Sequence, residues 1–538
     1  MAVIKLKVHS SRLVEQQQKL NELLKEIKAR RVQPEDRYEI AALLESMGWN
    51  DERAAKKYGV QDIFELASQL WDISKSNIIF TPFHHVEKMG LLKALYLIVS
   101  NFLRGAIFAL PMAVSVFSMI SLRFSLWSYE DLSLELATAI AIGTILSFIT
   151  VGGFMQAIAR RGFFYIIQDY YGMARKVTFQ FITLGTFTCL AISAFIFFGN
   201  SLIQLFPYRM IVIIILYYFF LNTIWLSVTV MYILKKDLVF TGLITIGIMI
   251  VYLLFVVFGL HIIVSQLISL LLVSFMGIGL AIYYFSKAEA KAEKGIEPKL
   301  PKMSVTIYNT MPYFLYGMLY FTFLFVDRVM AWSVDNAFLP YLIWFRGDYE
   351  LGLDFSLLVL IIPMGIIEVV LSKLLTNIQK SQKNYWGQDI DKMNRRYIRE
   401  YFIRGAFIFI VSMVSALLLY YYVGVFLDIF HPELRAVIYH NPVTHFVFVS
   451  SLVSYVFLSV GLMNAVTMFS LSQSHKVIKT ITPALLVNLV VGFILSRWFG
   501  YKFAVVGLLI GSIVFVLLSS WQVFLVIRKL DYYIYSSS

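Results

Sequence analysis

Long apolar segments follow one another from Leu91 to Ile527 with few polar interruptions. The hydrocarbon core of a bilayer is about 30 Å thick, so a helix needs about 20 apolar residues to cross it. By this criterion the chain contains about twelve such segments. Because unpaired backbone groups are costly in lipid, a chain of this kind crosses the membrane as helices. The sequence therefore predicts an all-α polytopic membrane protein.

The composition agrees with this prediction. Charged residues make up 15% of the chain, whereas a soluble domain carries about 25%. The net charge of +13 comes mostly from Lys and Arg in short polar segments. The sequence shows no groove-reading or base-stacking module, so we expect no nucleic-acid partner. The single cysteine, Cys189, lies in an apolar segment and excludes a disulfide within the chain.

The expected spans form two sets of six, separated by a polar cytosolic linker at 286–303. Only the stretch from Gly259 to His261 separates two of these spans, which leaves a re-entrant pair there as an alternative. We predict a first transmembrane lobe at 89–285, a second at 304–530 and a cytosolic tail at 531–538. The spans are 103–126, 134–158, 177–199, 209–233, 238–260 and 262–285 in the first set, and 305–331, 352–377, 404–426, 443–469, 480–499 and 503–527 in the second.

Two lobes of equal size indicate an internal duplication, which is a recurrent design among transporters. The sequence contains a weak echo of such a repeat. The first span opens with Asn101-Phe-Leu-Arg-Gly and has Pro111 further on, and the seventh contains Asn309-Thr-Met-Pro312 with Gly317 further on. Since Pro and Gly are frequent in membrane helices generally, chance also accounts for this echo.

Basic residues set the expected orientation, because cytoplasmic loops are enriched in Lys and Arg. Loops on one side contain pairs such as Arg160-Arg161 and Lys235-Lys236, and this side exceeds the other more than threefold in basic residues. We therefore expect a multi-pass protein of the plasma (inner) membrane with both termini in the cytosol. On the cytosolic side we expect the basic segment 379–401 to lie on anionic membrane lipids.

The first 88 residues differ from the rest and predict a small cytosolic helical domain. Apolar residues at helical spacing indicate helices at about 13–27, 35–47, 51–57 and 61–71, with Asn50 as the N-cap of the third. The domain lacks a Gly-rich phosphate loop and a Cys/His metal spacing. We expect residues 1–85 to serve either as a structural cap or as a docking surface for a cytosolic synthase or regulator.

Ionisable residues inside a span are costly and are candidates for function. Glu368, in the eighth span, is the strongest candidate, because a carboxylate there could carry a proton, pair with a cation or contact a polar substrate. An interhelical hydrogen bond, or a side chain that reaches the cytosolic surface, is the structural alternative. Asp327 and Arg328 lie near the outer end of the seventh span, and as neighbours they point about 100° apart on a helix. They therefore need not pair with each other.

Neutral polar and aromatic residues complete the candidates for substrate contact. Asn222, Asn464 and Asn488 lie deep in their spans, where they could line a cavity or bond neighbouring helices. Tyr316 and Tyr320 could stack on sugar rings or belong to the interfacial aromatic belt. The sequence contains no Walker loop and no His-Glu-x-x-His motif. We therefore expect no metal site, no cofactor and no enzymatic activity.

These features together resemble the MOP flippase superfamily, which includes multidrug and toxin extruders (MATE) and MATE-like polysaccharide exporters. The architectural resemblance covers about 91–530, whereas residues 1–85 lie outside it. A sharper resemblance covers about 310–390. Phe325-Val-Asp327-Arg328-Val-Met-Ala-Trp332 is similar to the seventh span of polysaccharide exporters, and Leu353-Asp354, Ile361-Ile362-Pro363 and Glu368 resemble the eighth span of the Pel exopolysaccharide transporter family. The resemblance implies alternating access of two lobes around a central cavity.

We therefore expect a transporter or flippase that moves a polysaccharide or lipid-linked oligosaccharide through a wide polar cavity between the lobes. Three alternatives stay open. A cation-coupled multidrug extruder would need carboxylates deep in the first lobe, and almost none lie between 140 and 285. A membrane-embedded transferase would need a catalytic cluster on its outer loops, and none is recognisable. A non-transporting membrane subunit of a polysaccharide synthase complex would bind its partner through the N-terminal domain.

Overall fold

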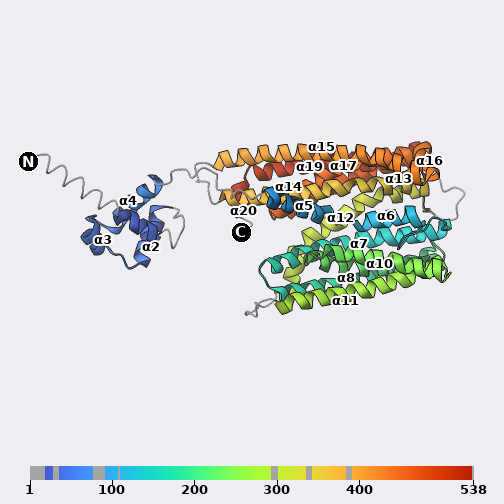
Figure 1. The fold of residues 1–538 in the computed structure, drawn as a ribbon, viewed down its shortest axis with the longest axis horizontal. Coiled ribbons are helices and arrows are strands. Elements are labelled where there is room, and N and C mark those ends of the chain that lie inside the picture. The colour runs from blue at the N-terminus through green and yellow to red at the C-terminus, as the bar shows by residue number, and fades with distance from the viewer. Residues whose placement is uncertain are drawn as a thin grey trace, which may run out of the picture. The chain divides into compact units, whose positions relative to one another are not determined.

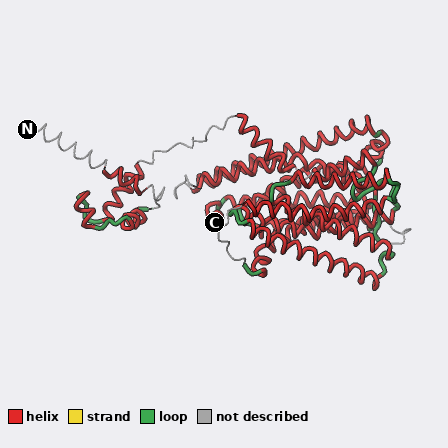
Figure 2. The backbone as a smooth tube through the Cα atoms, turned by 60° about the horizontal axis from the view of Figure 1, so that its bottom comes forward, coloured by secondary structure: helices red, strands yellow, loops and turns green. Residues whose placement is uncertain are grey.

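The computed structural model describes residues 19–27, 36–76, 91–106, 110–291, 301–334, 342–382 and 390–535. The chain divides into two compact units, Met1–Leu95 and Tyr96–Ser538. Within the described residues every regular element is a helix, apart from one isolated bridge between Phe124 and Tyr129. Figures 1 and 2 show this all-helical architecture, which confirms the predicted fold class.

The N-terminal unit is a small bundle with its own apolar core. Its described helices are residues 19–27, α2 (Arg37–Ser46), α3 (Asp51–Tyr58) and α4 (Ile63–Ser76). As expected, the Asn50 side chain caps α3 by accepting a hydrogen bond from the backbone nitrogen of Arg53 at 3.0 Å. Gly59 ends the helix with a φ of +71°, a conformation that suits glycine. The predicted helical residues before 19 lie outside the described residues. The core contains Leu20, Leu23, Leu24, Ile27, Ile40, Leu44, Ala54, Leu66 and Leu70.

The membrane unit contains eleven helices long and apolar enough to cross a bilayer within the described residues, and one shorter apolar helix at Ala113–Leu122. Its first half consists of α5 (Leu91–Ala106), α6 (Leu110–Leu122), α7 (Leu134–Ile167), α8 (Tyr171–Ile203), α9 (Tyr208–Ile233), α10 (Asp237–Tyr252) and α11 (Ile262–Lys291). Its second half consists of α12 (Met303–Trp332), α13 (Gly347–Leu357), α14 (Ile361–Gln382), α15 (Ile390–Phe430), α16 (Pro432–His440), α17 (Pro442–Ser470), α18 (Ser474–Phe499), α19 (Ala504–Ile527) and α20 (Leu530–Tyr535).

Three places in the predicted spans can be compared with the structure, and at one of them it corrects the prediction. Of the first, predicted at 103–126, the structure describes α5 and α6, and residues 107–109 lie outside the described residues. The ninth begins at Ile390 rather than near 404, because Glu400 forms ion pairs with Arg396 and Arg404 one turn away on either side and so supports the helix beyond its apolar part. Near Gly259 the chain turns with a positive φ between Leu238–Val257 and Ile262–Ala290, which are each long and apolar enough to cross a bilayer. This favours two spans over the re-entrant alternative.

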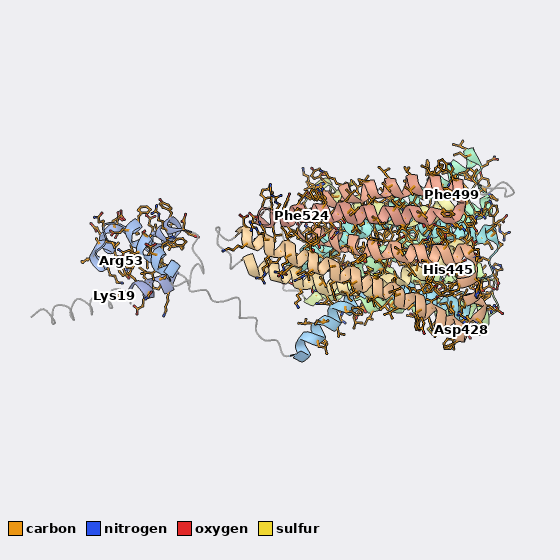
Figure 3. The ribbon with its side chains drawn as sticks, turned by 90° about the horizontal axis from the view of Figure 1, so that it is seen from above. Lys19, Arg53, Asp428, His445, Phe499 and Phe524 are labelled. Carbon is orange, nitrogen blue, oxygen red and sulfur yellow. The ribbon has the colours of Figure 1, made fainter. Side chains whose placement is uncertain are left out.

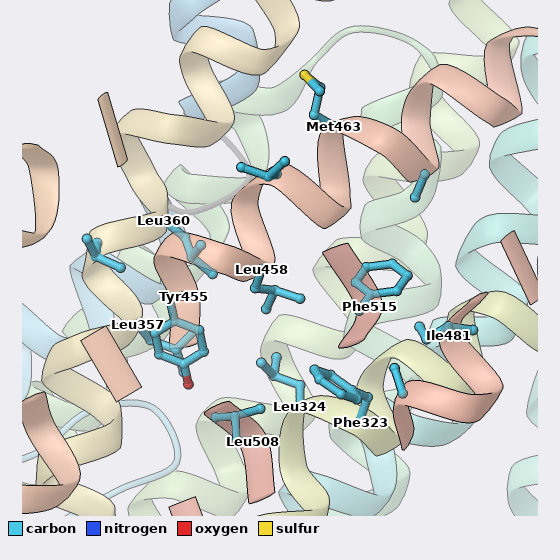
Figure 4. Close-up of a cluster of buried hydrophobic side chains, with 14 of the residues drawn as sticks. Phe323, Leu324, Leu357, Leu360, Tyr455, Leu458, Met463, Ile481, Leu508 and Phe515 are labelled. Atoms are coloured by element: carbon cyan, nitrogen blue, oxygen red, sulfur yellow. The ribbon is translucent and has the colours of Figure 1, made fainter. Parts of the chain in front are cut away.

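The membrane helices form two lobes, each built around one buried helix. In lobe 1 (α6–α11) the central helix is α9, and in lobe 2 (α12–α19) it is α17. Figure 1 shows the green and cyan helices of lobe 1 beside the yellow to red helices of lobe 2, with α12 running between them. Figure 4 shows the apolar core of lobe 2, where Phe323 and Leu324 of α12 meet side chains such as Leu458, Leu508 and Phe515.

The two ends of the membrane unit differ in composition. Figure 3 shows Phe499, His445 and Asp428 at one end and Phe524 near the other. The Phe524 end carries the turns with the predicted cytosolic basic pairs, because α9 ends at Ile233 just before Lys235 and Lys236 and α19 ends just before Arg528 and Lys529. We call it the basic end and the other the opposite end.

Candidate functional site

Four charged residues lie together in lobe 2, near the opposite end. We call Asp327, Arg328, Glu350 and Asp354 the ionic cluster. Arg328 of α12 forms an ion pair with Glu350 and another, at 3.0 Å, with Asp354, both on α13. Asp327, Arg328 and Glu350 are at most 6% exposed, whereas the Asp354 side chain is 48% exposed. The cluster therefore reaches from the core of lobe 2 to an accessible carboxylate.

Asp327 and Arg328 have different partners, as their neighbouring positions on a helix require. The carboxylate of Asp327 accepts a hydrogen bond from the Tyr349 hydroxyl at 2.8 Å. Its other oxygen, Oδ1, has no hydrogen-bond partner among the described residues, and neither has the buried hydroxyl of Tyr455. Tyr455 belongs to α17 and lies close enough to Arg328 to interact with its charge. Two buried polar atoms at one site therefore stay available to a ligand or a proton.

The ionic cluster contains more acid than base. With every group ionised, three carboxylates surround one guanidinium, and Trp332 adds a hydrogen bond of 2.9 Å to Glu350. A buried carboxylate without a matching cation is costly in a low-dielectric interior. The cluster therefore favours uptake of a proton or another cation at this place.

Sequence reasoning missed Glu350. The eighth span was expected to begin at 352, which left Glu350 in a loop, whereas α13 begins at Gly347. Glu350 and Asp354 are four residues apart, so they project from the same face of a helix. That spacing, opposite a lone arginine in the preceding span, is the signal that could have found the site.

Aromatic rings fill the contact between the lobes. Phe148 of α7 stacks on Phe321 and Phe325 of α12, with ring centroids 5.6 and 5.4 Å apart. On its other side Phe148 lies 4.9 Å from Trp225 of lobe 1. We call Phe148, Trp225, Phe321 and Phe325 the aromatic seam. The wide polar cavity expected between the lobes is therefore wrong for the α7–α12 contact in this conformation, because apolar rings exclude water there.

The two predicted tyrosines lie next to this seam. The rings of Tyr316 and Tyr320 stack with their centroids 5.9 Å apart. The centroid of the Tyr320 ring also lies 5.3 Å from that of Phe321. Tyr316 contacts Phe469 of α17 at 4.8 Å and is buried. Their place inside the protein, beside the lobe contact, excludes a position in the interfacial belt.

Beside the seam, α7 and α12 cross at glycine residues. A methyl group added to Gly153 would lie 2.7 Å from the ring of Phe314 and 2.9 Å from its carbonyl oxygen, and one added to Gly317 would overlap the carbonyl of Gly152. Only glycine permits two backbones to approach this closely. The backbones of the two lobes are therefore in direct contact here.

The same crossing occurs a second time, between α5 and α14. A methyl group added to Gly365 would lie 2.7 Å from the ring of Phe102 and 2.9 Å from its carbonyl oxygen, which are the distances found at Gly153. A methyl group added to Gly105 would lie 2.8 Å from the Cα atom of Gly365. Phe102 and Phe314 are 212 residues apart in the chain, and so are Gly153 and Gly365. The two crossings are therefore equivalent parts of a duplicated structure.

This repeat corrects the register of the predicted echo. Phe102-Leu-Arg-Gly105 corresponds to Phe314-Leu-Tyr-Gly317, and not Asn101 to Asn309. Glu368 corresponds to Gln156 in this repeat. A side-chain carbon of Glu368 lies 2.9 Å from a methyl group added to Gly105, and one of Gln156 lies 2.9 Å from a methyl group added to Gly317. Glu368 is half-buried and lies against α5. It is therefore in a helix crossing and is not part of the ionic cluster.

The three predicted asparagines bond neighbouring helices. Asn222 donates to the sulfur of Cys189 at 3.1 Å, which joins α9 to α8. Asn464 donates to Ser519 and accepts from Tyr401, so it joins α17 to α19 and α15. Asn488 donates to the carbonyl oxygen of Phe323 at 3.0 Å. These contacts support the interhelical alternative for all three.

Among the described residues there is no group of three His, Cys, Asp or Glu side chains that could hold a metal ion. No protein-family model matches the chain, and no curated protein matches it. Several solved structures match the chain over most of its length. The eukaryotic MATE transporter AtDTX14 matches with a TM-score of 0.56 at 14% identity, over 82% of this chain and 99% of that one.

Two further neighbours agree with it. The MATE transporter VcmN of Vibrio cholerae matches with a TM-score of 0.53 at 13% identity, over 81% of this chain and 96% of that one. The chain has the MATE transporter fold. A multidrug resistance MATE family transporter of the MOP superfamily, in an outward-facing conformation, matches with a TM-score of 0.52 at 12% identity, over 81% of this chain and 97% of that one. The MATE fold accounts for the two lobes, whereas membership of the MOP superfamily and of the Pel family stays a prediction.

Proposed function

We propose that this chain is a plasma-membrane transporter that moves a polysaccharide or lipid-linked oligosaccharide by alternating access of its two lobes. The observation that carries the proposal is the row of aromatic rings at the contact between lobes, formed by the aromatic seam with Tyr316 and Tyr320. Sugar rings have apolar C–H faces that pack on aromatic rings. When the lobes separate, these rings become exposed and offer stacking partners along the path.

In this proposal the ionic cluster is the site where a proton or cation gradient acts on the transporter. Asp327 Oδ1 and the Tyr455 hydroxyl are buried without hydrogen-bond partners in the described part of the chain, and Asp354 reaches the surface. Binding of a proton or cation here would change the ion pairs between α12 and α13. Because α12 also packs against α7 of lobe 1, such a change is transmitted directly to the lobe contact.

A cation-coupled multidrug extruder is the second candidate. Aromatic rings also bind flat cationic drugs, and the surplus of carboxylates in the ionic cluster fits cation coupling. Against it, every described side chain of lobe 1 that is both polar and buried is neutral. The polymer proposal therefore has the wider support, and the two differ in the molecule that moves.

The test uses the purified chain in liposomes with two probes, a fluorescent lipid-linked oligosaccharide and ethidium. The polymer proposal predicts translocation of the oligosaccharide, loss of this activity in Asp327→Asn and in Glu368→Gln, and retention in the control Glu135→Gln, whose carboxylate is exposed at the opposite end. Movement of ethidium alone would identify an extruder. If neither probe moves and the protein still retains a synthase partner, the chain is a non-transporting subunit.

A further inference from the structure

A hollow of about 430 Å³ opens at the basic end of lobe 1, between the beginning of α8 and the end of α11. It is separate from the ionic cluster and from the aromatic seam. Its walls are formed by Gly172, Arg175, Lys176, Phe179, Ile282 and Glu289. This volume lies within the range of sites that bind small molecules, about 300 to 1,000 Å³.

One end of the hollow attracts anions. Arg175 and Lys176 lie in the first turns of α8 and bring two cations, of which Arg175 forms an ion pair of 2.8 Å with Glu289. Among the described residues, the N-cap residue of α8, Tyr170, makes no side-chain hydrogen bond to the first turn. The backbone N–H groups of the first turn therefore add a partial positive charge beside the two cations.

The other end of the hollow is apolar and continues onto the surface that faces lipid. Phe179 and Ile282 form its wall, and Ile282 is 44% exposed. Farther from the basic end on the same two helices, Phe187 and Phe275 are also exposed. In a membrane this exposed apolar surface is covered by acyl chains.

We propose that this hollow is a binding site for one anionic phospholipid, with the phosphate at Arg175, Lys176 and the α8 N-terminus and an acyl chain along Phe179 and Ile282. A free phosphate would use only the basic end and would gain nothing from the apolar wall. A zwitterionic lipid would bring its own cation next to Arg175 and Lys176. The combination of both ends therefore selects a lipid with a net negative headgroup. This inference does not depend on which substrate the chain transports.

The experiment is native mass spectrometry of the full chain in detergent, with phosphatidylglycerol or phosphatidylcholine added at equal concentrations. We expect one phosphatidylglycerol to be retained in preference to phosphatidylcholine. Each basic residue near an anionic lipid surface is worth about 1 kcal/mol, so the double variant Arg175→Ala with Lys176→Ala should weaken retention roughly ten- to thirty-fold. The matched control is Lys235→Ala with Lys236→Ala, which removes two exposed cations from the α9–α10 turn and should leave retention unchanged.

A second variant keeps the test decisive should the double variant fail to fold. Glu289→Gln releases Arg175 from its ion pair, so retention of phosphatidylglycerol should rise several-fold. Unchanged retention in Glu289→Gln or in the double variant would overturn the proposal, as would equal retention of phosphatidylcholine. Displacement of the lipid by glycerol phosphate at the same concentration would also overturn it, because the site would then take a soluble anion.

Discussion

The two lobes share one architecture but differ in what they bury. Lobe 1 joins its helices with neutral groups, such as Gln266, which accepts a hydrogen bond from Tyr217 at 2.6 Å and donates to the carbonyl oxygens of Ser125 and Ser128. Lobe 2 buries Asp327, Arg328 and Glu350. Charges inside a membrane protein are expensive and are retained where they serve a purpose. In the transport cycle that we propose, lobe 2 takes up the cation and lobe 1 is the passive partner.

The equivalent helix crossings show the same contrast on a smaller scale. Both place a phenylalanine and a glycine of one helix against a glycine of the other, 212 residues apart in the chain. The residues beside the contact differ in charge, because Glu368 corresponds to Gln156 and Arg104 corresponds to Tyr316. Geometry is therefore shared by the two crossings, whereas the charged members of these pairs, Arg104 and Glu368, both belong to the α5–α14 crossing.

The largest expected effect comes from removing one carboxylate of the ionic cluster. Glu350→Ala leaves Arg328 buried with Asp354 as its remaining carboxylate partner, and loss of one member of a buried pair costs about 3–5 kcal/mol. The variant chosen for comparison in lobe 1 is Gln266→Ala. It should cost about 1–3 kcal/mol, because it leaves neutral groups without partners. Thermal unfolding of the purified variants measures both, and equal losses would erase the contrast between the lobes.

The next effect tests whether the crossings are equivalent. Gly317→Ala and Gly105→Ala each place a methyl group against backbone atoms, and we expect each to destabilise the protein by about 1–3 kcal/mol through overpacking. Gly199→Ala is the control, since nothing lies within 4 Å of its added methyl group, and it should be neutral or stabilising. A destabilised Gly317→Ala together with a neutral Gly105→Ala would contradict the duplication.

A smaller effect separates the polar contacts of the two lobes. Asn464 bonds Tyr401, Ser519 and Ser520 on two other helices, and at about 0.6 kcal/mol for each interhelical bond its replacement by Ala should cost about 2 kcal/mol. Asn222→Ala loses one interhelical bond, to Cys189, and should cost about 0.6 kcal/mol. Thermal unfolding again provides the measurement, and the reverse order would show that these bonds do not set the stability of the lobes.

The smallest effect on stability should accompany a large effect on transport. The hydroxyl of Tyr455 makes no hydrogen bond with the described residues, so Tyr455→Phe should change stability by less than about 0.5 kcal/mol. In our account the hydroxyl faces the ionic cluster and is kept for a proton or cation, so transport in liposomes should fall. Full transport by Tyr455→Phe would restrict the cluster to a structural role.

The sequence was sufficient to predict the helical fold, because span length and hydropathy depend on residues close together in the chain. Most predicted span limits agree with the structure to within a few residues, as at Leu134 and Tyr208. The helix crossings could not be found in this way. They depend on which glycine faces which helix. The weak echo paired Asn101 with Asn309, whereas the crossings pair Phe102 with Phe314. Glu350 was missed for the same reason, because its ion pair with Arg328 depends on the packing of α13 against α12.

A lock between the lobes tests the central claim, that transport requires them to separate. The backbone nitrogen of Phe345 in lobe 2 donates to Thr138 of α7 at 3.0 Å, so we would place a cysteine pair at these two positions after replacing Cys189 by Ser. The control pair is Ser356 and Ser451, whose hydroxyls lie 2.7 Å apart within lobe 2.

The measurement is translocation in liposomes of the probe that the unlinked protein moves, before and after disulfide formation and again after reduction. Our account predicts that the link between lobes stops translocation and that reduction restores it, while the link within lobe 2 has no effect. Undiminished translocation with the lobes fully cross-linked would contradict it.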